Sequence, residues 1–262
     1  MSRYAAMFER LGAEGAFGAF LMLGDPNLEA SARLLDAVVA GGADMIEVGI
    51  PFSDPVADGP VIQAAAQRAL AAGVTVDDCF RLLTDFRERY PDLPVGVLTY
   101  ANLVMARPGF LRDAAEAGVD SLLIADVPAL EAEPFAQAMA QAGIEQVLIA
   151  AANTPDATLA RIARLSGAYT YCVSRAGITG THAAGQFDAG LVKRVVQAGG
   201  PPPVFGFGIS RPEHVRAALA AGARGVICGS AIVDSAARGE DVTELVRSLK
   251  AATTERVGTA MN

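Results

Sequence analysis

The sequence predicts an α/β protein in which eight parallel strands, each followed by at least one helix, close into a (β/α)8 barrel of the TIM type. Short apolar runs alternate with amphipathic stretches along the whole chain, and repeated βα units require a parallel sheet covered by helices. The chain has 262 residues and 52% of them are hydrophobic, so it can bury a large core. An open, doubly wound sheet is the alternative, but eight units in a chain of this length favour closure.

Eight short apolar runs have the length of strands, and we expect strands at Ala16–Leu23, Asp44–Val48, Val95–Thr99, Ser121–Ala125, Gln146–Ala150, Tyr169–Val173, Val204–Phe207 and Gly225–Cys228. Helical periodicity predicts helices near residues 28–40, 61–71, 77–89, 109–117, 131–142, 156–165, 188–198, 212–221 and 231–251. Tyr4, Met7 and Leu11 recur at helical spacing and predict an extra N-terminal helix. Because no linker or change of composition divides the chain, we expect one domain over residues 1–262.

Composition excludes several classes of function. The net charge of −8, with no basic stripe, argues against nucleic-acid binding. Cys79, Cys172 and Cys228 form no C-x-x-C pair, so we expect reduced thiols rather than disulfides or a zinc site. His182 and His214 are the only histidines, which argues against a histidine-based metal centre. The sequence has no signal-peptide pattern and no uninterrupted apolar run of membrane-spanning length, so we expect a cytoplasmic protein that binds no membrane.

Glu47 stands within an apolar strand, between Ile46 and Val48. Because side chains alternate along a strand, Glu47 points to the opposite face from these aliphatic neighbours, towards the interior of the predicted barrel. A buried carboxylate is costly unless its charge or its proton is used, so we expect Glu47 to be a catalytic acid–base group. The alternative is a structural carboxylate held by backbone donors.

A Pro/Gly loop follows this strand and carries Asp54 and Asp58. Asp58 is either a second functional carboxylate or the N-cap of the helix that begins two residues later. The C-terminal ends of barrel strands hold the active site, so other polar residues there are candidates as well. Asp25, Asp126 and Asn153 also follow strands, but for these three we favour helix capping or turn formation.

Two glycine-rich segments, Gly206–Gly208 and Gly229-Ser230, follow the last two predicted strands. Glycines let backbone N–H groups approach an anion, and a helix N-terminus follows Gly229. Phosphate binding at these two loops recurs in the fold, and tight turns without a ligand are the alternative. Arg211 stands where a third glycine of a dinucleotide motif would be, so NAD binding is not supported.

Residues 174–185 form a long segment rich in Gly, Thr and Ala, which is typical of a lid at the mouth of a barrel. His182 lies in this segment. A lone histidine in a loop is usually exposed to solvent, and we favour that interpretation over catalysis.

Together these residues resemble the tryptophan synthase alpha subunit family, the indole-3-glycerol-phosphate lyases, over nearly the whole chain. The segments that carry the resemblance are Leu23–Pro26, Ile46–Pro60, Tyr100–Asn102, Ala125–Pro128, Tyr169–Tyr171, Ser174–Gly180, Gly206–Ser210 and Gly229–Ile232. The stretch from Ile46 to Pro60 is the most specific of them, because other phosphate-binding barrels share the glycine motifs.

The resemblance implies a retro-aldol cleavage of indole-3-glycerol phosphate to indole and D-glyceraldehyde 3-phosphate. Glu47 would be the acid–base group, and Asp58 would accept the indole N–H and stabilise positive charge on the ring. Protonation of indole C3 creates an internal electron sink. We therefore expect no metal and no organic cofactor on this chain.

The resemblance also implies a site for each end of the substrate. The indole would lie in an apolar slot lined by Phe20, Leu98, Tyr100, Leu123, Ile149, Tyr171, Phe207 and Ile227. The phosphate would bind to backbone N–H groups of Gly180, Gly208, Gly229 and Ser230. Thr179 would steady Asp58 when the lid closes. Ordinary barrel packing is the alternative for any one of the apolar residues.

Members of this family work with a beta subunit, and the implied partner contacts are Pro51 and Asp54. The expected assembly is an α2β2 heterotetramer that catalyses the last step of tryptophan biosynthesis. In it, the beta subunit carries pyridoxal phosphate (PLP) and receives the indole. The sequence departs from the family at Met22, where a small polar residue is common, and over Thr181–Gln186.

Three alternative functions stay open at this point. Another phosphate-sugar barrel enzyme, such as an epimerase or an isomerase, would need histidines at strand ends or an aspartate within the first strand, and the sequence has neither. A regulatory subunit that mainly activates a partner, and a stand-alone lyase that releases free indole, are the other two.

Overall fold

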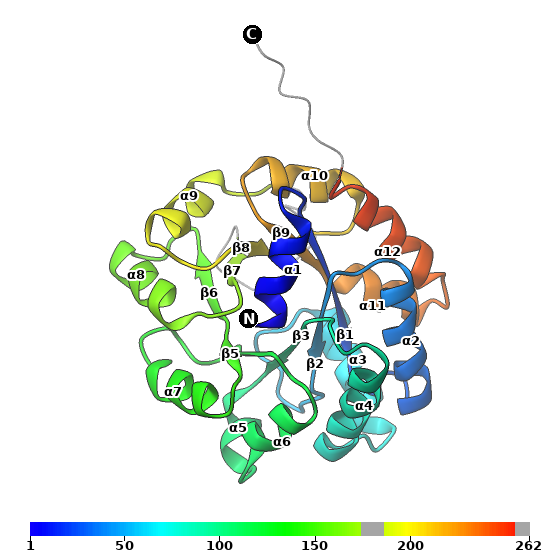
Figure 1. Ribbon diagram of the computed structural model, residues 1–262. Helices are drawn as coiled ribbons and strands as arrows, with labels where there is room; N and C mark the ends of the chain where they lie inside the picture. Colours follow the sequence, from blue (N-terminus) through cyan, green and yellow to red (C-terminus); the bar gives the residue numbers. More distant parts are fainter. Residues whose placement is uncertain (174–185, 255–262) are drawn as a thin grey trace.

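A parallel β-sheet, rolled into a barrel, lies at the centre of the molecule, and helices surround it (Figure 1). The structure, a computed structural model, describes residues 1–173 and 186–254. The strands are β1 (Ala16–Met22), β2 (Met45–Gly49), β3 (Val95–Thr99), β4 (Ser121–Ile124), β5 (Glu145–Gln146), β6 (Leu148–Ala151), β7 (Thr170–Val173), β8 (Pro203–Phe205) and β9 (Gly225–Cys228). Every pair of neighbours is parallel, in the order β5-β4-β3-β2-β1-β9-β8-β7-β6. The predicted barrel is confirmed.

The predicted strand Gln146–Ala150 is divided in two, and this division closes the barrel. β5 pairs with β4, whereas β6 pairs with β7 on the other side. Val147 lies between the two short strands, and its N–H donates to the carbonyl of Leu122 over 3.0 Å. The strands at the two ends of the sheet, β5 and β6, are therefore separated along the chain by Val147 alone. The β4–β5 ladder ends at Leu122 and Gln146, so β4 and β6 separate beyond that point.

The alternation predicted for β2 is confirmed. Ile46 and Val48 belong to the apolar layer between the strands and the outer helices. Met45, on the opposite face, belongs to a second apolar cluster inside the barrel. Glu47 shares the inward face with Met45 because side chains alternate along a strand.

The outer helices cover the barrel much as the sequence predicts. They are α2 (Leu28–Ala40), α3 (Pro60–Ala71), α4 (Val76–Arg89), α5 (Ala101–Ala106), α6 (Phe110–Glu116), α7 (Glu133–Gln141), α8 (Asp156–Leu165), α9 (Ala189–Gln197), α10 (Pro212–Ala220), α11 (Ser230–Ala237) and α12 (Val242–Ala251). No helix among the described residues is long and apolar enough to cross a membrane.

Two expectations about helices were wrong. The helix predicted over 231–251 is two helices, because Gly239 adopts a left-handed φ of 71° after α11 and the side chain of Asp241 accepts the N–H of Glu244 to begin α12. α5 was not predicted, because six residues are too few to show a helical period.

The predicted N-terminal helix, α1 (Arg3–Leu11), closes the N-terminal end of the barrel, and Figure 1 shows it across the centre of the ring. Its buried Tyr4 and Met7 join the apolar cluster of the barrel interior. The Tyr4 hydroxyl lies 2.9 Å from Ser121 Oγ, and its ring lies 5.6 Å from that of Tyr169. α1 therefore fills one end, and substrate access is left to the C-terminal ends of the strands.

Candidate active site

Glu47 projects into the barrel interior and is 3% exposed. Its Oε1 accepts a hydrogen bond of 2.8 Å from the hydroxyl of Tyr169, at the start of β7. Its Oε2 is buried and has no hydrogen-bond partner among the described residues. Burial raises the pKa of Glu47 to about 7, the Tyr169 hydrogen bond opposes this rise and the charge of Asp58 adds to it. Near neutral pH the carboxyl can therefore both donate and accept a proton.

Asp58 lies in the loop between β2 and α3, and its Oδ2 accepts a hydrogen bond of 2.8 Å from the Tyr100 hydroxyl. Burial raises the pKa of Asp58 above its ordinary value, and the hydrogen bond from Tyr100 opposes the rise. The residue that caps α3 is Gly59, followed by Pro60 at the first helical position. Asp58 is therefore not the N-cap of this helix, which removes the capping alternative.

Seven of the eight residues expected around an indole ring lie in, or pack against, one apolar cluster inside the barrel. These seven are Phe20, Leu98, Leu123, Ile149, Tyr171, Phe207 and Ile227. Tyr171 and Phe207 meet edge to face, with ring centroids 5.7 Å apart. The exception is Tyr100, whose ring stacks on Phe52 at 5.2 Å.

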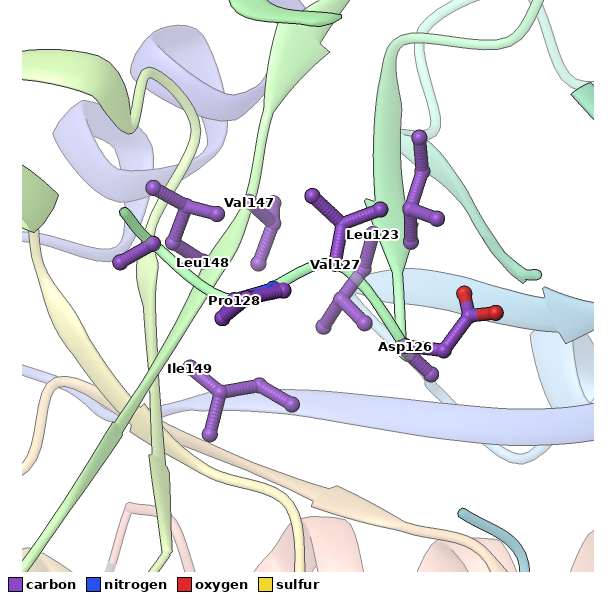
Figure 2. Close-up of a pocket in the computed structure, with 10 residues that line it drawn as sticks. Leu123, Asp126, Val127, Pro128, Val147, Leu148 and Ile149 are labelled. Atoms are coloured by element: carbon purple, nitrogen blue, oxygen red, sulfur yellow. The ribbon is translucent and has the colours of Figure 1, made fainter. Parts of the chain in front are cut away.

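A cavity of about 250 Å³ lies where β4 and β6 separate, and Figure 2 shows the residues that line it. Leu123 and Ile149 are the two predicted indole-site residues among them. Asp126 also lines it, but its Oδ1 accepts the N–H of Ala101 over 2.8 Å, at the start of α5. Asp126 lies in the turn after β4, which the Val127 N–H closes to the carbonyl of Ile124 at 3.2 Å, so the turn formation favoured for Asp126 is confirmed. It is not the N-cap of the next helix, α7, which begins after Ala132.

The glycine-rich loops follow β8 and β9, which are neighbours in the sheet. Gly208 is exposed and has a φ of 78°, in the left-handed region that favours glycine. Gly229 and Ser230 are partly exposed at the N-terminus of α11, where the first N–H groups have no partner within the helix. A Cβ on Gly229 would have the side chain of Phe20 as its nearest neighbour, at 3.6 Å, so this loop adjoins the apolar wall.

Several predicted residues lie elsewhere or outside the described residues. Thr179, Gly180 and His182 belong to the segment that the structure does not describe. In the β2–α3 loop Asp54 is exposed, but Pro51 is buried.

Of the two roles favoured for Asp25, the turn is confirmed, because its N–H donates to the carbonyl of Met22 over 3.3 Å, and helix capping was wrong. Its carboxylate forms a bidentate ion pair with Arg68 of α3, at 2.7 Å to each oxygen, and the N-cap of α2 is Asn27. Asn153 is exposed.

Sequence reasoning missed the role of Tyr169 and the hydrogen bonds of Tyr100. The signal for Tyr169 was present, because it lies two residues before Tyr171 and so shares its face of the strand. No group of three or more His, Cys, Asp or Glu side chains suited to a metal ion occurs within residues 1–173 and 186–254.

Comparison with known proteins agrees with this geometry. The family described as "Tryptophan synthase alpha chain" matches residues 8–260. The tryptophan synthase alpha chain of Aeromonas hydrophila is 52% identical over 238 residues, which cover 89% of each chain. A chain of Mycobacterium tuberculosis tryptophan synthase superposes with a TM-score of 0.87 at 30% identity, covering 96% of this chain and 98% of that one. A chain of the tryptophan synthase complex from Pyrococcus furiosus gives a TM-score of 0.80 at 32% identity, over 90% and 98%. The chain therefore belongs to the tryptophan synthase alpha chain family.

Proposed function

We propose that Glu47 and Asp58 together carry out the carbon–carbon cleavage that this family catalyses. As a member of the family, the chain is a lyase that cleaves indole-3-glycerol phosphate to indole and D-glyceraldehyde 3-phosphate, and the indole passes to the beta subunit for tryptophan biosynthesis. The observation that carries the residue assignment is the buried Glu47 carboxyl, with a pKa near 7 and an oxygen unpartnered among the described residues.

The reaction needs a proton delivered to indole C3 and a proton removed from the hydroxyl on the adjacent side-chain carbon. Protonation at C3 converts the indole into an indolenine. When the hydroxyl loses its proton, the bond from C3 to that carbon breaks. The carbon becomes the aldehyde of glyceraldehyde 3-phosphate, and the bonding electrons return to the ring. The substrate itself thus holds the electrons, and the chain's task is to move protons and stabilise charge.

Glu47 suits the proton transfers because a general acid–base group works best when its pKa is near the working pH. Its neutral form gives a proton to C3, and the resulting carboxylate then takes the hydroxyl proton. Tyr169 holds Oε1, so Oε2 is the oxygen we assign to the substrate.

Asp58 suits the second role, because a carboxylate can accept the indole N–H and offset the positive charge that protonation places on the ring. Tyr100 donates to Asp58 and so favours its ionised form. Thr179 would steady this carboxylate when the lid closes.

The two ends of the substrate have matching surroundings. We assign the indole to the apolar cluster between Phe20 and Tyr171, next to the two carboxylates. We assign the phosphate to the N–H groups of Gly208, Gly229 and Ser230, together with Gly180. The short approach between Gly229 and Phe20 supports a continuous site, because the phosphate loop adjoins the indole wall.

We also assign the partner surface to the C-terminal face of the barrel, with the exposed Asp54 at the contact; the buried Pro51 is not available for the contact expected from the sequence. Three large apolar side chains are exposed in successive segments after β2, β3 and β4, namely Val56 (71%), Met105 (73%) and Leu130 (64%). Such exposed apolar groups at one end of a barrel fit a docked partner in an α2β2 assembly.

PLP is assigned to the beta subunit. A PLP enzyme holds the cofactor through a lysine Schiff base. This chain has two lysines, and both lie on outer helices: Lys193 on α9, and Lys250 on α12, where it pairs with Asp44.

Two experiments test the proposal. Co-crystallisation with an indole-propanol phosphate should place the ring beside Glu47 and Asp58 and the phosphate at Gly208, Gly229 and Ser230. A ligand bound at the α1 end would contradict the site. Indole formation by the purified chain, measured with and without a beta subunit, separates a partner-dependent lyase from a stand-alone enzyme and from a purely regulatory subunit.

A further inference from the structure

We propose that Tyr100 is a positioning residue, which fixes both the Asp58 carboxylate and the loop that carries it. The inference rests on the function proposed for Asp58. From the sequence, Tyr100 is expected only as one of eight residues that line the indole slot. We now assign it a second role, which is to orient Asp58 towards the indole N–H.

The Tyr100 hydroxyl makes two hydrogen bonds to successive residues of the β2–α3 loop. It donates to Asp58 Oδ2 over 2.8 Å and accepts the N–H of Ala57 over 3.2 Å. One phenol oxygen thus uses its donor and an acceptor site on the same turn of the chain. Phenylalanine at this position could make neither bond.

The hydroxyl is held in place by the packing of its own ring. Tyr100 is 2% exposed and directly follows β3, so its backbone is anchored to the barrel. Its ring stacks on Phe52, near the other end of the same loop, with planes 29° apart. Tyr100 therefore contacts the loop near both ends, through an aromatic stack at Phe52 and through hydrogen bonds at Ala57 and Asp58.

Between these contacts the loop is held by local backbone hydrogen bonds, from Val56 to Asp54 and from Asp58 to Pro55. Val56, in its middle, is 71% exposed. Gln63 of α3 adds a side-chain bond at the end of the loop, because its Nε2 donates to the backbone carbonyl of Asp58 over 2.8 Å. That bond holds the backbone of Asp58, whereas Tyr100 sets the direction of its carboxylate. With a donor fixed on Oδ2, Oδ1 is the oxygen that accepts the indole N–H.

The electrostatic surroundings give this hydrogen bond a measurable signature. Burial raises the pKa of Asp58, and the hydrogen bond from Tyr100 lowers it. Within residues 1–173 and 186–254, the other titratable groups that interact with this pair are Glu47, Tyr171 and Asp126. Burial and the Asp58 charge raise the pKa of Tyr100 itself, so the phenol stays protonated and remains a donor.

The test compares four forms of the full-length protein: the unsubstituted chain, Tyr100→Phe, Asp58→Asn and the double variant. Indole formation is measured across a range of pH. We expect Tyr100→Phe to lower kcat by about ten- to a hundredfold, the range for losing a hydrogen bond to a charged group. We also expect the acid limb of its kcat/KM profile to move to higher pH, because Asp58 loses the donor that favours ionisation.

The double variant and a matched control separate positioning from general packing. Once Asp58 is asparagine, the further change of Tyr100 should cost less than about twofold, since residues that act through one another are not additive. Tyr90→Phe removes a phenol at the C-terminal end of α4, far from this loop, and should leave kcat and the pH profile unchanged.

A second variant guards against loss of folding. Phe52→Leu keeps the Tyr100 hydroxyl but removes the ring that stacks on it, and it should shift the acid limb in the same direction by a smaller amount. A Tyr100→Phe protein with unchanged kcat and acid limb, next to an Asp58→Asn protein whose kcat has fallen by about a hundredfold, would overturn the positioning role. An Asp58→Asn protein with less than about a tenfold loss would instead overturn the function proposed for Asp58.

Discussion

The two carboxylates of the site are supported in different ways, although each accepts a 2.8 Å hydrogen bond from a tyrosine hydroxyl. Glu47 lies on β2 and its partner Tyr169 precedes β7, so barrel strands fix both groups. Asp58 lies in a loop, and its partner Tyr100 is the only one of the two that is anchored to a strand. Because it projects from a strand into the barrel, Glu47 is buried, and burial raises its pKa to about 7. The loop support leaves the Asp58 carboxylate only partly buried, at the C-terminal end of the barrel.

The largest effect expected from this comparison is at Glu47. Glu47→Gln keeps the shape and an acceptor for Tyr169 but removes the titrating proton, so indole formation should fall by about a thousandfold or more. Glu145→Gln is the matched control, because burial also raises the pKa of Glu145 but this residue lies at the N-terminal end of the barrel. Steady-state assays of both variants check the expectation. Normal turnover by Glu47→Gln would refute the catalytic role.

A smaller loss is expected at the loop carboxylate. Asp58→Asn should lower kcat by about a hundredfold, because the amide removes the negative charge that offsets the developing charge on the ring. Asp36→Asn makes the same change on the outer face of α2 and should have no effect on turnover. A loss of less than about tenfold at Asp58 would mean that the loop contributes shape rather than charge.

Much of the barrel could be predicted because its signals are local. Apolar runs, helical periodicity and the alternation around Glu47 each report the conformation of a few neighbouring residues. The division at Val147 could not be predicted, because it depends on which strand each half pairs with across the sheet. α5 and the break at Gly239 were missed because a short helix and an interrupted one leave weak periodicity.

Within the candidate site, the sequence pointed to the two carboxylates, whereas their hydrogen bonds to tyrosines became visible only in the structure. Glu47 is conspicuous because a charged residue interrupts an apolar strand. In the sequence, Tyr169 and Tyr100 look like ordinary strand aromatics. Tyr169 is 122 residues away from Glu47, and Tyr100 is 42 residues away from Asp58, so only the fold brings these hydroxyls to the carboxylates. The same holds for Asp25, which resembles a cap in sequence but pairs with Arg68 on the next helix but one.

The wall shared by both carboxylates gives the next prediction. Burial raises the pKa of Tyr171, and the charges of Glu47 and Asp58 add to the rise, so this phenol is electrostatically coupled to both carboxylates. A Cβ on Gly206 would lie 1.9 Å from Cζ and Oη of Tyr171. Gly206→Ala should therefore displace this ring, lower stability by about 1–3 kcal/mol and reduce turnover.

The matched glycine in the neighbouring loop is Gly229, where an added Cβ meets no atom within 3.4 Å. Thermal unfolding of Gly229→Ala should be close to that of the unsubstituted protein. Adding Tyr171→Leu to Gly206→Ala should recover part of the lost stability. Equal stability of the two glycine variants would show that Tyr171 has room to move.

The last effect concerns stability rather than turnover, and it follows from the different burial of the two carboxylates. The folded-state pKa of Glu47 is about 7, above its ordinary value of 4.5. Between these values the unfolded chain has lost a proton that the folded chain keeps, so stability falls as pH rises through this window. Glu47→Gln has no such titration and should be more stable than the unsubstituted protein at pH 8 by about 3 kcal/mol, with little difference at pH 4.5. Urea unfolding at both pH values measures this difference in stability, with Glu29→Gln, a change at an exposed residue, as the control.

Asp58→Asn should show a smaller gain of the same sign, because Asp58 is only partly buried and its pKa is also raised. A gain at Glu47 that is equal at both pH values would mean that packing, rather than the buried charge, separates the strand carboxylate from the loop carboxylate.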